Sequence, residues 1–298
     1  MLDISGDTSH NPFPTESELY FPVVERENAW LDRNGNPHRI GKQKSLIRMT
    51  ADHRPQWLAN VGENYKVVKN KELFPYMENE MTRVIDQQYL QDVTVNDKMA
   101  LNGRDCYREY IFNQLKCADF GRGDVAFRII LGNSYGSKAV SMLFGAIDFW
   151  CDNGMIIGVK EKQTRKHTSG VTIAGFSGWV ADAVNQFAKH GERIERYNDT
   201  MIDLTKEDGL FEYLSEKGIL SDKMGRKMQV AMHTERNKRG GRDVRPSMWD
   251  LYSALTAWAT HDDVRDTGND HEANTRIQRS QHVERVISAA DKWMTADA

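Results

Sequence analysis

The clearest pattern in the chain lies between Arg122 and Lys160, where apolar and polar positions follow a period of two. Apolar side chains recur at Val125, Phe127, Ile129 and Leu131. Turn-forming residues follow at 132–136, and Asn153-Gly154 is a pair that tolerates the positive φ of a hairpin turn. A helical spacing also fits residues 139–150, but the turns on both sides favour a strand. The segment therefore predicts three antiparallel strands.

The residues before this segment predict a second group of hairpins. Strands are expected at 46–49, between residues 55 and 62, and at 65–68. Asn70 is expected to cap a helix that carries Met77, Met81, Val84 and Ile85 at helical spacing. A further hairpin is expected from 93 to 112, with its turn at Asn102-Gly103.

The second half of the chain shows helical periodicity instead. Ser177 is expected to cap a helix whose apolar face begins at Trp179. Capping boxes at 205–208 and 247–250 predict two further helices, and Gly218 is expected to end the first of them. A last helix carries Ile277, Val283, Val286, Ile287 and Trp293.

These elements predict an α+β fold, with an antiparallel hairpin-rich sheet from the first half packed by helices from the second. Three parts are expected: an extended N-terminal arm at 1–44, a main α+β domain at 45–261 and a C-terminal helix at 262–298. We expect most of the tryptophans, Trp57 included, to pack in the core. Tyr135, at a turn, is the aromatic residue most expected to be exposed.

Composition indicates a globular protein of the cytoplasm. The 298 residues are 39% hydrophobic and 28% charged, and no apolar run approaches the roughly 20 residues that a membrane span needs. The N-terminus has no basic and apolar signal-peptide pattern. The three cysteines show no CxxC spacing, so neither a disulfide framework nor a zinc ribbon is expected.

Basic residues are concentrated in two segments of an acidic chain. The net charge is −3, yet residues 160–167 carry +3 and residues 226–245 carry +5, which leaves −11 for the remainder. Local positive fields of this kind can bind a polyanion despite the overall sign. Two solvated loops are an equally good explanation from charge alone.

The chain has no recognised catalytic signature, neither a phosphate-binding loop nor a metalloprotease or esterase motif. We therefore expect no enzyme activity and no cofactor. The sharpest enzymatic alternative is a cluster of acids and histidines, of the residue types that bind divalent metals. It consists of His261, Asp262, Asp263, Asp266, Asp270, His271 and Glu272. A solvated loop between two helices is the alternative for this segment.

Four segments in this order resemble a family of unknown function found in bacteriophages and mobile elements. They are residues 46–74, the hairpin NSYGSKAVSMLFGAIDFWCDNGMIIG at 133–158, RKHTSG at 165–170 and MWDLYSALTAWATH at 248–261. The chain departs from the family where an arginine usually precedes the hairpin cysteine. The family is distantly similar to single-strand annealing proteins of the RecT, Red-beta and Rad-type superfamily. That resemblance implies a hairpin-rich sheet with a packed helix, assembly into rings or filaments, and ATP-independent binding of single-stranded DNA.

We therefore expect a phage-type protein that binds and anneals single-stranded DNA in recombination, without a nucleotide or metal. The residues expected to contact DNA are Arg128, Lys138, Lys160, Lys162, Arg165, Lys166, His167, Arg236, Lys238, Arg239 and Arg242. The expected partners are single-stranded DNA, further copies of the chain, and a phage exonuclease or host single-strand binding protein, with no membrane. Two alternatives stay open. One is a metal-dependent nuclease or phosphohydrolase at 261–272, and the other is an acidic phage protein that inhibits a host enzyme.

Overall fold

The computed structural model describes residues 12–52, 54–119, 124–136, 138–148, 153–156, 163–240, 244–264 and 272–296. In these residues the first half of the chain forms two antiparallel sheets and one long helix, and the second half is mostly helical. The α+β fold expected from the sequence is confirmed. In the described part of the chain, no helix combines the length and the apolar character needed to cross a membrane.

The larger sheet has six described strands, and all of their pairings are antiparallel. Its order is β4-β5-β6-β7-β8, and β9 also pairs with β7. The strands are β4 (Val93–Ala100), β5 (Asp105–Asp119), β6 (Asp124–Ser134), β7 (Val140–Asp148), β8 (Asn153–Ile156) and β9 (Gln163–Arg165). The three central strands expected from the sequence are β6, β7 and β8, and the preceding expected hairpin is β4 with β5. Asn102 takes the left-handed conformation at that turn, with φ of 60°. The expected turn at Asn153-Gly154 is wrong, because both residues lie inside β8 and pair with β7.

The two faces of the larger sheet differ because side chains alternate along each strand. The core face carries buried apolar residues of the main core, among them Tyr110, Phe112, Phe127, Ile129, Leu131 and Phe144. The opposite face, called here the groove face, carries Asn96, Lys98, Glu109 and Arg128, with a small apolar cluster of Ala100, Tyr107, Ile130 and Leu143. The period of two in the sequence thus separates a core from a polar surface.

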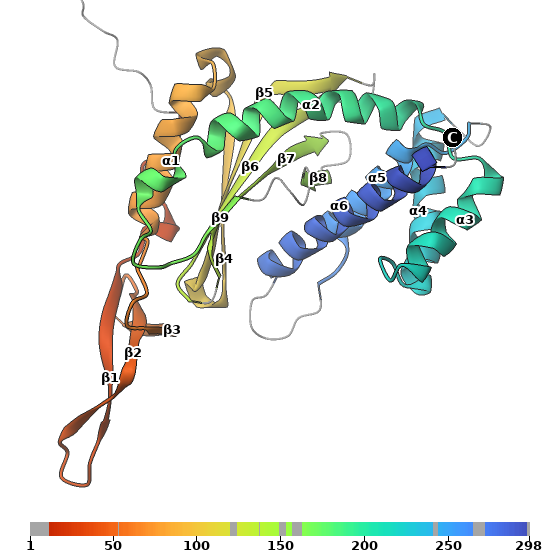
Figure 1. Ribbon diagram of the computed structural model, residues 1–298. Coiled ribbons are helices and arrows are strands. Elements are labelled where there is room, and N and C mark those ends of the chain that lie inside the picture. The colour runs from red at the N-terminus through yellow and green to blue at the C-terminus, as the bar shows by residue number, and fades with distance from the viewer. Residues whose placement is uncertain are drawn as a thin grey trace, which may run out of the picture.

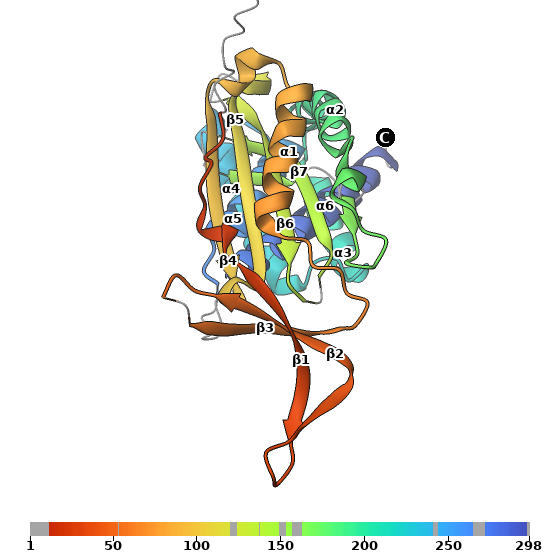
Figure 2. The same cartoon turned by 90° about the vertical axis from the view of Figure 1, so that its left-hand side faces the viewer.

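Helices lie on both sides of this sheet (Figure 1, Figure 2). The core face is covered by α1 (Asn70–Val84) and by the N-terminal part of α2 (Trp179–Asp199), where Phe187 packs on Phe127 with ring centroids 4.8 Å apart. The groove face looks toward α5 (Met248–His261) and α6 (Glu272–Ala296). The result is three layers with the sheet in the middle.

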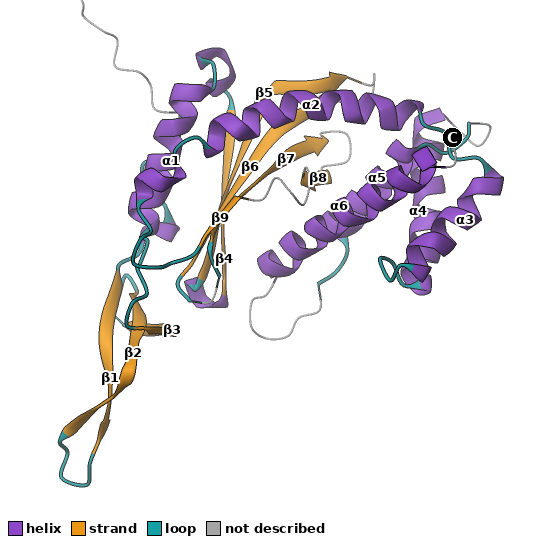
Figure 3. Cartoon of the chain, in the orientation of Figure 1, coloured by secondary structure: helices purple, strands orange, loops and turns teal. Residues whose placement is uncertain are grey.

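The C-terminal part of α2 leaves the sheet and joins a group of helices (Figure 3). This group includes α3 (Leu204–Glu216), α4 (Asp222–Gly240), α5 and α6. Arg193 of α2 donates to both carboxylate oxygens of the buried Glu284 of α6, at 2.7 and 3.0 Å. This two-pronged ion pair fixes α6 to α2, and so fixes the helical wall that faces the sheet.

A smaller sheet of β1 (Val23–Leu31), β2 (Pro37–Met49) and β3 (Pro55–Gly62) lies at one end of the molecule. The far parts of β1 and β2 project from the body as a two-stranded ribbon (Figure 1, Figure 2). The extended N-terminal arm expected at 1–44 includes β1 and the first part of β2, which pair as a β-hairpin, and residue 45 lies inside β2. The sequence hid the hairpin because most of its side chains are exposed on both faces, which removes the period of two.

Residues 12–20 are held against the core face by a buried charge. Arg108 is fully buried and lies 3.3 Å from Glu78 and 3.5 Å from Asp97. Its guanidinium also donates to the hydroxyl of Tyr20 and to the carbonyl of Pro14. Because a buried charge must be paired, this network joins β5, α1, β4 and the N-terminal segment.

Several expected helix caps are wrong, although the helices themselves form. Asn70 lies in the first turn of α1, where its buried amide donates to the carbonyl of Leu19 rather than capping the helix. α3 is capped by Asp203, whose carboxylate accepts from two backbone amides, and Gly178 rather than Ser177 precedes α2. The capping box from Ser247 to Asp250 and the left-handed Gly218 after α3 are confirmed.

Three expectations about the first half are also wrong. Residues 65–68 form no strand; they run beside the sheet, and the Tyr65 hydroxyl donates to the carbonyl of Ser134. Tyr135 is buried, because its hydroxyl accepts the backbone N–H of Asn70. Trp57 is 58% exposed instead of packing in the core.

Candidate nucleic-acid interface

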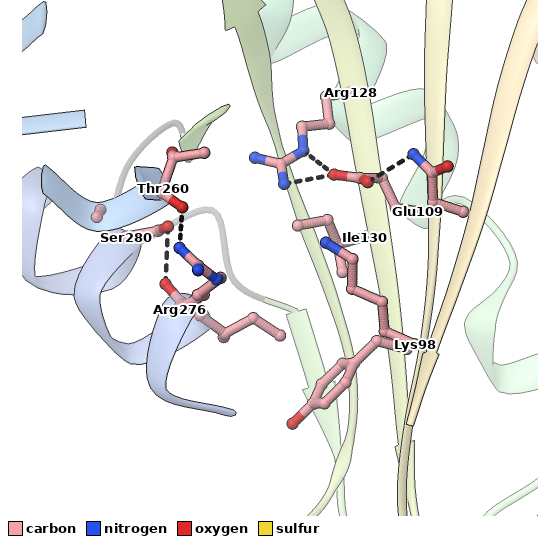
Figure 4. A pocket seen from close by; sticks show the side chains of 11 residues that line it. Lys98, Glu109, Arg128, Ile130, Thr260, Arg276 and Ser280 are labelled. Carbon is pink, nitrogen blue, oxygen red and sulfur yellow. Dashed lines mark hydrogen bonds and ion pairs between the residues drawn. The ribbon is translucent and has the colours of Figure 1, made fainter. Parts of the chain in front are cut away.

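A cleft lies between the groove face of the sheet and the helices α5 and α6 (Figure 4). Its sheet wall consists of Asn96, Lys98, Tyr107, Glu109, Arg128 and Ile130. Its helical wall consists of Ala259, Thr260, Arg276, Ile277 and Ser280. Three cationic side chains and one carboxylate line this space, so we call it the cationic cleft.

Strand register explains how the sheet wall is assembled. Asn96 pairs with Glu109 and Lys98 pairs with Tyr107 across β4 and β5, and Glu109 in turn pairs with Ile130 of β6. Directly paired residues project from the same face of a sheet. Residues far apart in the sequence therefore form one continuous row on the groove face.

A short chain of polar contacts holds Arg128 in place (Figure 4). Two nitrogens of its guanidinium contact one oxygen of Glu109, Nε at 2.5 Å, and the Asn96 amide donates to the other oxygen at 3.0 Å. Burial acts to raise the pKa of Glu109, but Arg128, Lys98 and Asn96 outweigh it and hold the pKa below its ordinary value. Glu109 is therefore ionised at neutral pH and orients Arg128 while neutralising part of its charge.

The other two cations of the cleft, Lys98 and Arg276, are not paired with Glu109. Lys98 is exposed and is in no hydrogen bond or ion pair within the described ranges. Arg276 pairs with Glu272 at 2.8 Å on α6, and its guanidinium also donates to the backbone carbonyl of Thr260. The three cations of the cleft are therefore offset by two carboxylates, Glu109 and Glu272, which leaves a net charge of +1.

A second cavity, of about 300 Å³, adjoins the cationic cleft and shares Tyr107 and Ile277 with it. Apart from Lys138, its lining is uncharged, with polar side chains from Ser134, Ser141, Thr164, Asn274, Gln278 and Gln281. The Nε2 donor of Gln281 is buried and has no hydrogen-bond partner among the described residues. We call this space the neutral cavity.

A buried carboxylate ties the walls of the neutral cavity together. Asp105 accepts hydrogen bonds from Ser134 at 2.7 Å, from Asn274 at 2.8 Å and from Lys138 at 2.8 Å. Burial acts to raise the pKa of Asp105, but these three donors outweigh it and lower the pKa. Asp105 is ionised at neutral pH, so it balances the charge of Lys138 and docks the start of α6 on the sheet.

Comparison with known families places the chain. Residues 57–286 match the family described as DUF932, a domain of unknown function. The chain belongs to the DUF932 family. The match includes both walls of the cationic cleft and of the neutral cavity. A comparison with curated proteins finds no significant match, and one with solved structures finds none.

Two of the DNA-contacting residues expected from the sequence lie in these two spaces of the DUF932 domain. Arg128 lies in the cationic cleft and Lys138 in the neutral cavity. Arg165 and Lys166 are exposed at the end of β9 but line neither space; on β9 only Thr164 lines the neutral cavity. Arg165 pairs with Val140 of the core face, so it projects from the other side of the sheet.

The remaining expected contacts are not gathered at the cleft. His167 is buried; its Nδ1 contacts the carbonyl of Lys66 at 3.0 Å and its ring stacks on Tyr65, so it packs rather than faces a ligand. Arg236 and Lys238 lie near the end of α4 and line neither space. Lys160, Lys162 and Arg242 lie outside the described residues, and for Arg239 only the backbone, in α4, is described.

Sequence reasoning missed Lys98 and Arg276, which are central to the cleft. Lys98 could have been found from the sequence. Thr94, Asn96 and Lys98 occupy every second position of β4, so they project from one face of the strand. No such signal marks Arg276, whose place in the cleft depends on how α6 docks. Neither residue lies in the two basic segments, 160–167 and 226–245.

The described residues of the acidic segment after α5 make ion-pair and backbone contacts. Asp262 pairs with Lys227 of α4 at 2.6 Å, and the backbone carbonyls of Asp262 and Asp263 accept from Arg279. Asp266, Asp270 and His271 lie outside the described residues. Among the residues that are described, no group of three or more His, Cys, Asp or Glu side chains could hold a metal ion.

Proposed function

We propose that this DUF932 protein binds single-stranded DNA along the groove face, with the phosphates in the cationic cleft and bases next to the neutral cavity. The observation that carries the proposal is the convergence of Lys98, Arg128 and Arg276 from two strands and a helix on one cleft. Cationic grooves that follow the backbone supply most of the affinity in sequence-independent binding of single strands.

The division of charge between the two spaces supports a nucleic acid over a simple anion. A single strand of DNA presents charged phosphates on one side and the uncharged hydrogen-bonding edges of its bases on the other. The neutral cavity offers the amides of Gln278 and Gln281 beside the cations of the cleft. Side-chain amides can pair with base edges through both their donor and acceptor groups.

The strand-annealing step extends this proposal and draws on the resemblance to the RecT and Red-beta superfamily. Neutralising the phosphates of one strand reduces its repulsion of a complementary strand. Annealing would then need neither a nucleotide nor a metal. We place the activity in phage recombination on the same resemblance.

The decisive test is a fluorescence-anisotropy titration of a labelled single-stranded oligonucleotide at low and moderate salt, without nucleotide or metal. The double variant Lys98→Gln and Arg276→Gln should bind at least about tenfold more weakly, a loss of about 1.4 kcal/mol in binding free energy. The slope of log affinity against log salt should become shallower by about 0.7 for each lost phosphate contact.

A matched control keeps the test specific. Lys69 and Lys71 are exposed at the start of α1, on the opposite side of the sheet, and the double variant Lys69→Gln and Lys71→Gln removes two positive charges without touching the cleft. This variant should bind like the wild type. Absence of salt-sensitive binding by the wild type at low salt would refute the proposal, and equal losses in both variants would refute the cleft as the site. Faster pairing after addition of the complementary strand tests annealing separately.

A further inference from the structure

The ribbon formed by β1 and β2 ends in a tip, residues 29–40, that carries large apolar side chains in water. Trp30 is 53%, Leu31 67% and Ile40 46% exposed. In the register of the hairpin, Trp30 lies opposite His38 and Leu31 lies opposite Pro37. The tip belongs to neither the cleft nor the cavity of the groove face.

These side chains lie on both faces of the ribbon tip. Trp30 stacks on His38 with ring centroids 4.6 Å apart, and Ile40 is two residues further along the same face. Leu31 projects from the opposite face, because neighbouring residues of a strand alternate. A two-stranded ribbon is only marginally stable alone in water, and clustered exposed apolar side chains are typical of contact surfaces.

The ribbon is also basic, whereas the rest of the chain is acidic. Residues 26–44 hold five Lys and Arg against two Asp and Glu, a net charge of +3. Since the whole chain carries −3, the remaining residues carry −6. The tip itself, residues 29–40, holds Arg33 and Arg39 against Asp32, a net charge of +1, so the surface that covers it is expected to combine apolar contact with negative charge.

Such a surface exists between α3 and α4, at the end of the molecule away from the ribbon (Figure 1). This acidic cleft, of about 360 Å³, is lined by Phe211, Glu212, Ser215, Glu216, Asp222, Gly225, Arg226 and Gln229. Glu212 and Glu216 are exposed and are in no ion pair within the described residues. Val230, which follows the lining residue Gln229 on α4, is 70% exposed and adds an apolar rim.

We infer that the ribbon tip of one copy of the chain docks in the acidic cleft of a second copy, head to tail. A ribbon cannot reach the cleft of its own chain, because the two lie at opposite ends of the molecule (Figure 1). The contact joins two different surfaces, so each copy keeps one of each for the next neighbour. Such contacts produce a ring when the rotation closes and a filament when it does not.

Sedimentation velocity of the full chain at micromolar concentrations tests this contact. The wild type should sediment above the 34.2 kDa of a single chain, and more so at low salt. The double variant Trp30→Ser and Leu31→Ser should return to the single-chain mass. Trp57→Ser removes an equally exposed tryptophan outside the tip and should leave the assembly intact. Unchanged thermal unfolding would show that the variants are folded.

A complementation experiment tests the acidic cleft as the acceptor. The double variant Glu212→Lys and Glu216→Lys should also sediment as a single chain. Mixed with the ribbon-tip variant, it should form a pair of chains, because one intact tip then meets one intact cleft. A tip-to-tip contact between copies predicts no recovery in this mixture.

Three results would overturn the inference. The first is a wild type that sediments as a single chain at low salt. The second is cleft variants that assemble like the wild type. The third is a ribbon-tip variant that keeps its assembly but loses affinity for single-stranded DNA, which would assign the tip to nucleic acid. None of these results depends on the proposed DNA-binding cleft, so the two proposals can fail separately.

Discussion

The two faces of the larger sheet are built by the same strands, yet one makes a core and the other makes a cleft. On β6, Phe127 is buried against α2, while the next residue, Arg128, faces the opposite way into the cationic cleft. The core face is covered by helices that bring apolar side chains. The groove face meets α5 and α6, which bring the polar Arg276 and Thr260 together with the apolar Ile277 and Ala259. Neighbouring positions should therefore respond to mutation in opposite ways.

The largest effect is expected on the core face. Phe127→Ala removes a fully buried ring that packs on Phe112 and Phe187, so the free energy of unfolding should fall by about 3–5 kcal/mol. Urea unfolding at neutral pH measures this fall in the free energy of unfolding. A loss below about 1 kcal/mol would show that this face is not the main core.

Arg108 is a charged residue on the core face, and it extends the comparison between the two faces of the sheet. Arg108→Met leaves the buried Glu78 and the half-buried Asp97 without their cation, so we expect a loss of about 3 kcal/mol in the free energy of unfolding. Residues 12–20 should become more accessible to a protease, because Tyr20 and Pro14 lose their contacts. Wild-type stability in this variant would contradict the role of the network.

On the groove face, Arg128→Gln should change affinity more than overall stability. The buried Glu109 loses its cation but keeps its hydrogen bond from Asn96. The free energy of unfolding should therefore fall by about 2 kcal/mol, less than for Phe127→Ala. Affinity for single-stranded DNA should fall about tenfold in the anisotropy titration. A stability loss as large as that of Phe127→Ala would mean that the two faces do not divide the work as described.

The smallest expected effect concerns the helices that hold the cleft wall. Burial, then the charge of Arg193, lowers the pKa of His190 well below its ordinary value. The unfolded chain therefore takes up the proton first, and stability falls as pH drops below about 6.5. Between about pH 7 and 5.5 the loss from this residue should be about 1 kcal/mol. His190→Leu should flatten the profile partly, since the pKa of His167 is also lowered by burial; an unchanged profile would exclude His190.

Sequence periodicity predicted the strands of the larger sheet and the sides from which Phe127 and Arg128 project, because both follow from local alternation. It did not predict the ribbon, whose side chains are exposed on both faces, nor the tether of Arg108 to residues 14 and 20. In the cationic cleft, Arg128 was among the residues expected from the sequence, and Lys98 could have been inferred from the alternation along its strand. Arg276 was not expected, because its position depends on the docking of α6 through Arg193 and Glu284, a contact between residues 91 positions apart.

The helix α2 has a mechanical consequence for the cleft. One half of it is anchored on the core face through Phe187, and the other half grips α6 through Arg193. It therefore connects the core face of the sheet to the group of helices and, together with the contact of Asn274 with Asp105, sets the spacing of the two walls. The width of the cationic cleft is therefore set when the protein folds, and a ligand would enter a preorganised site.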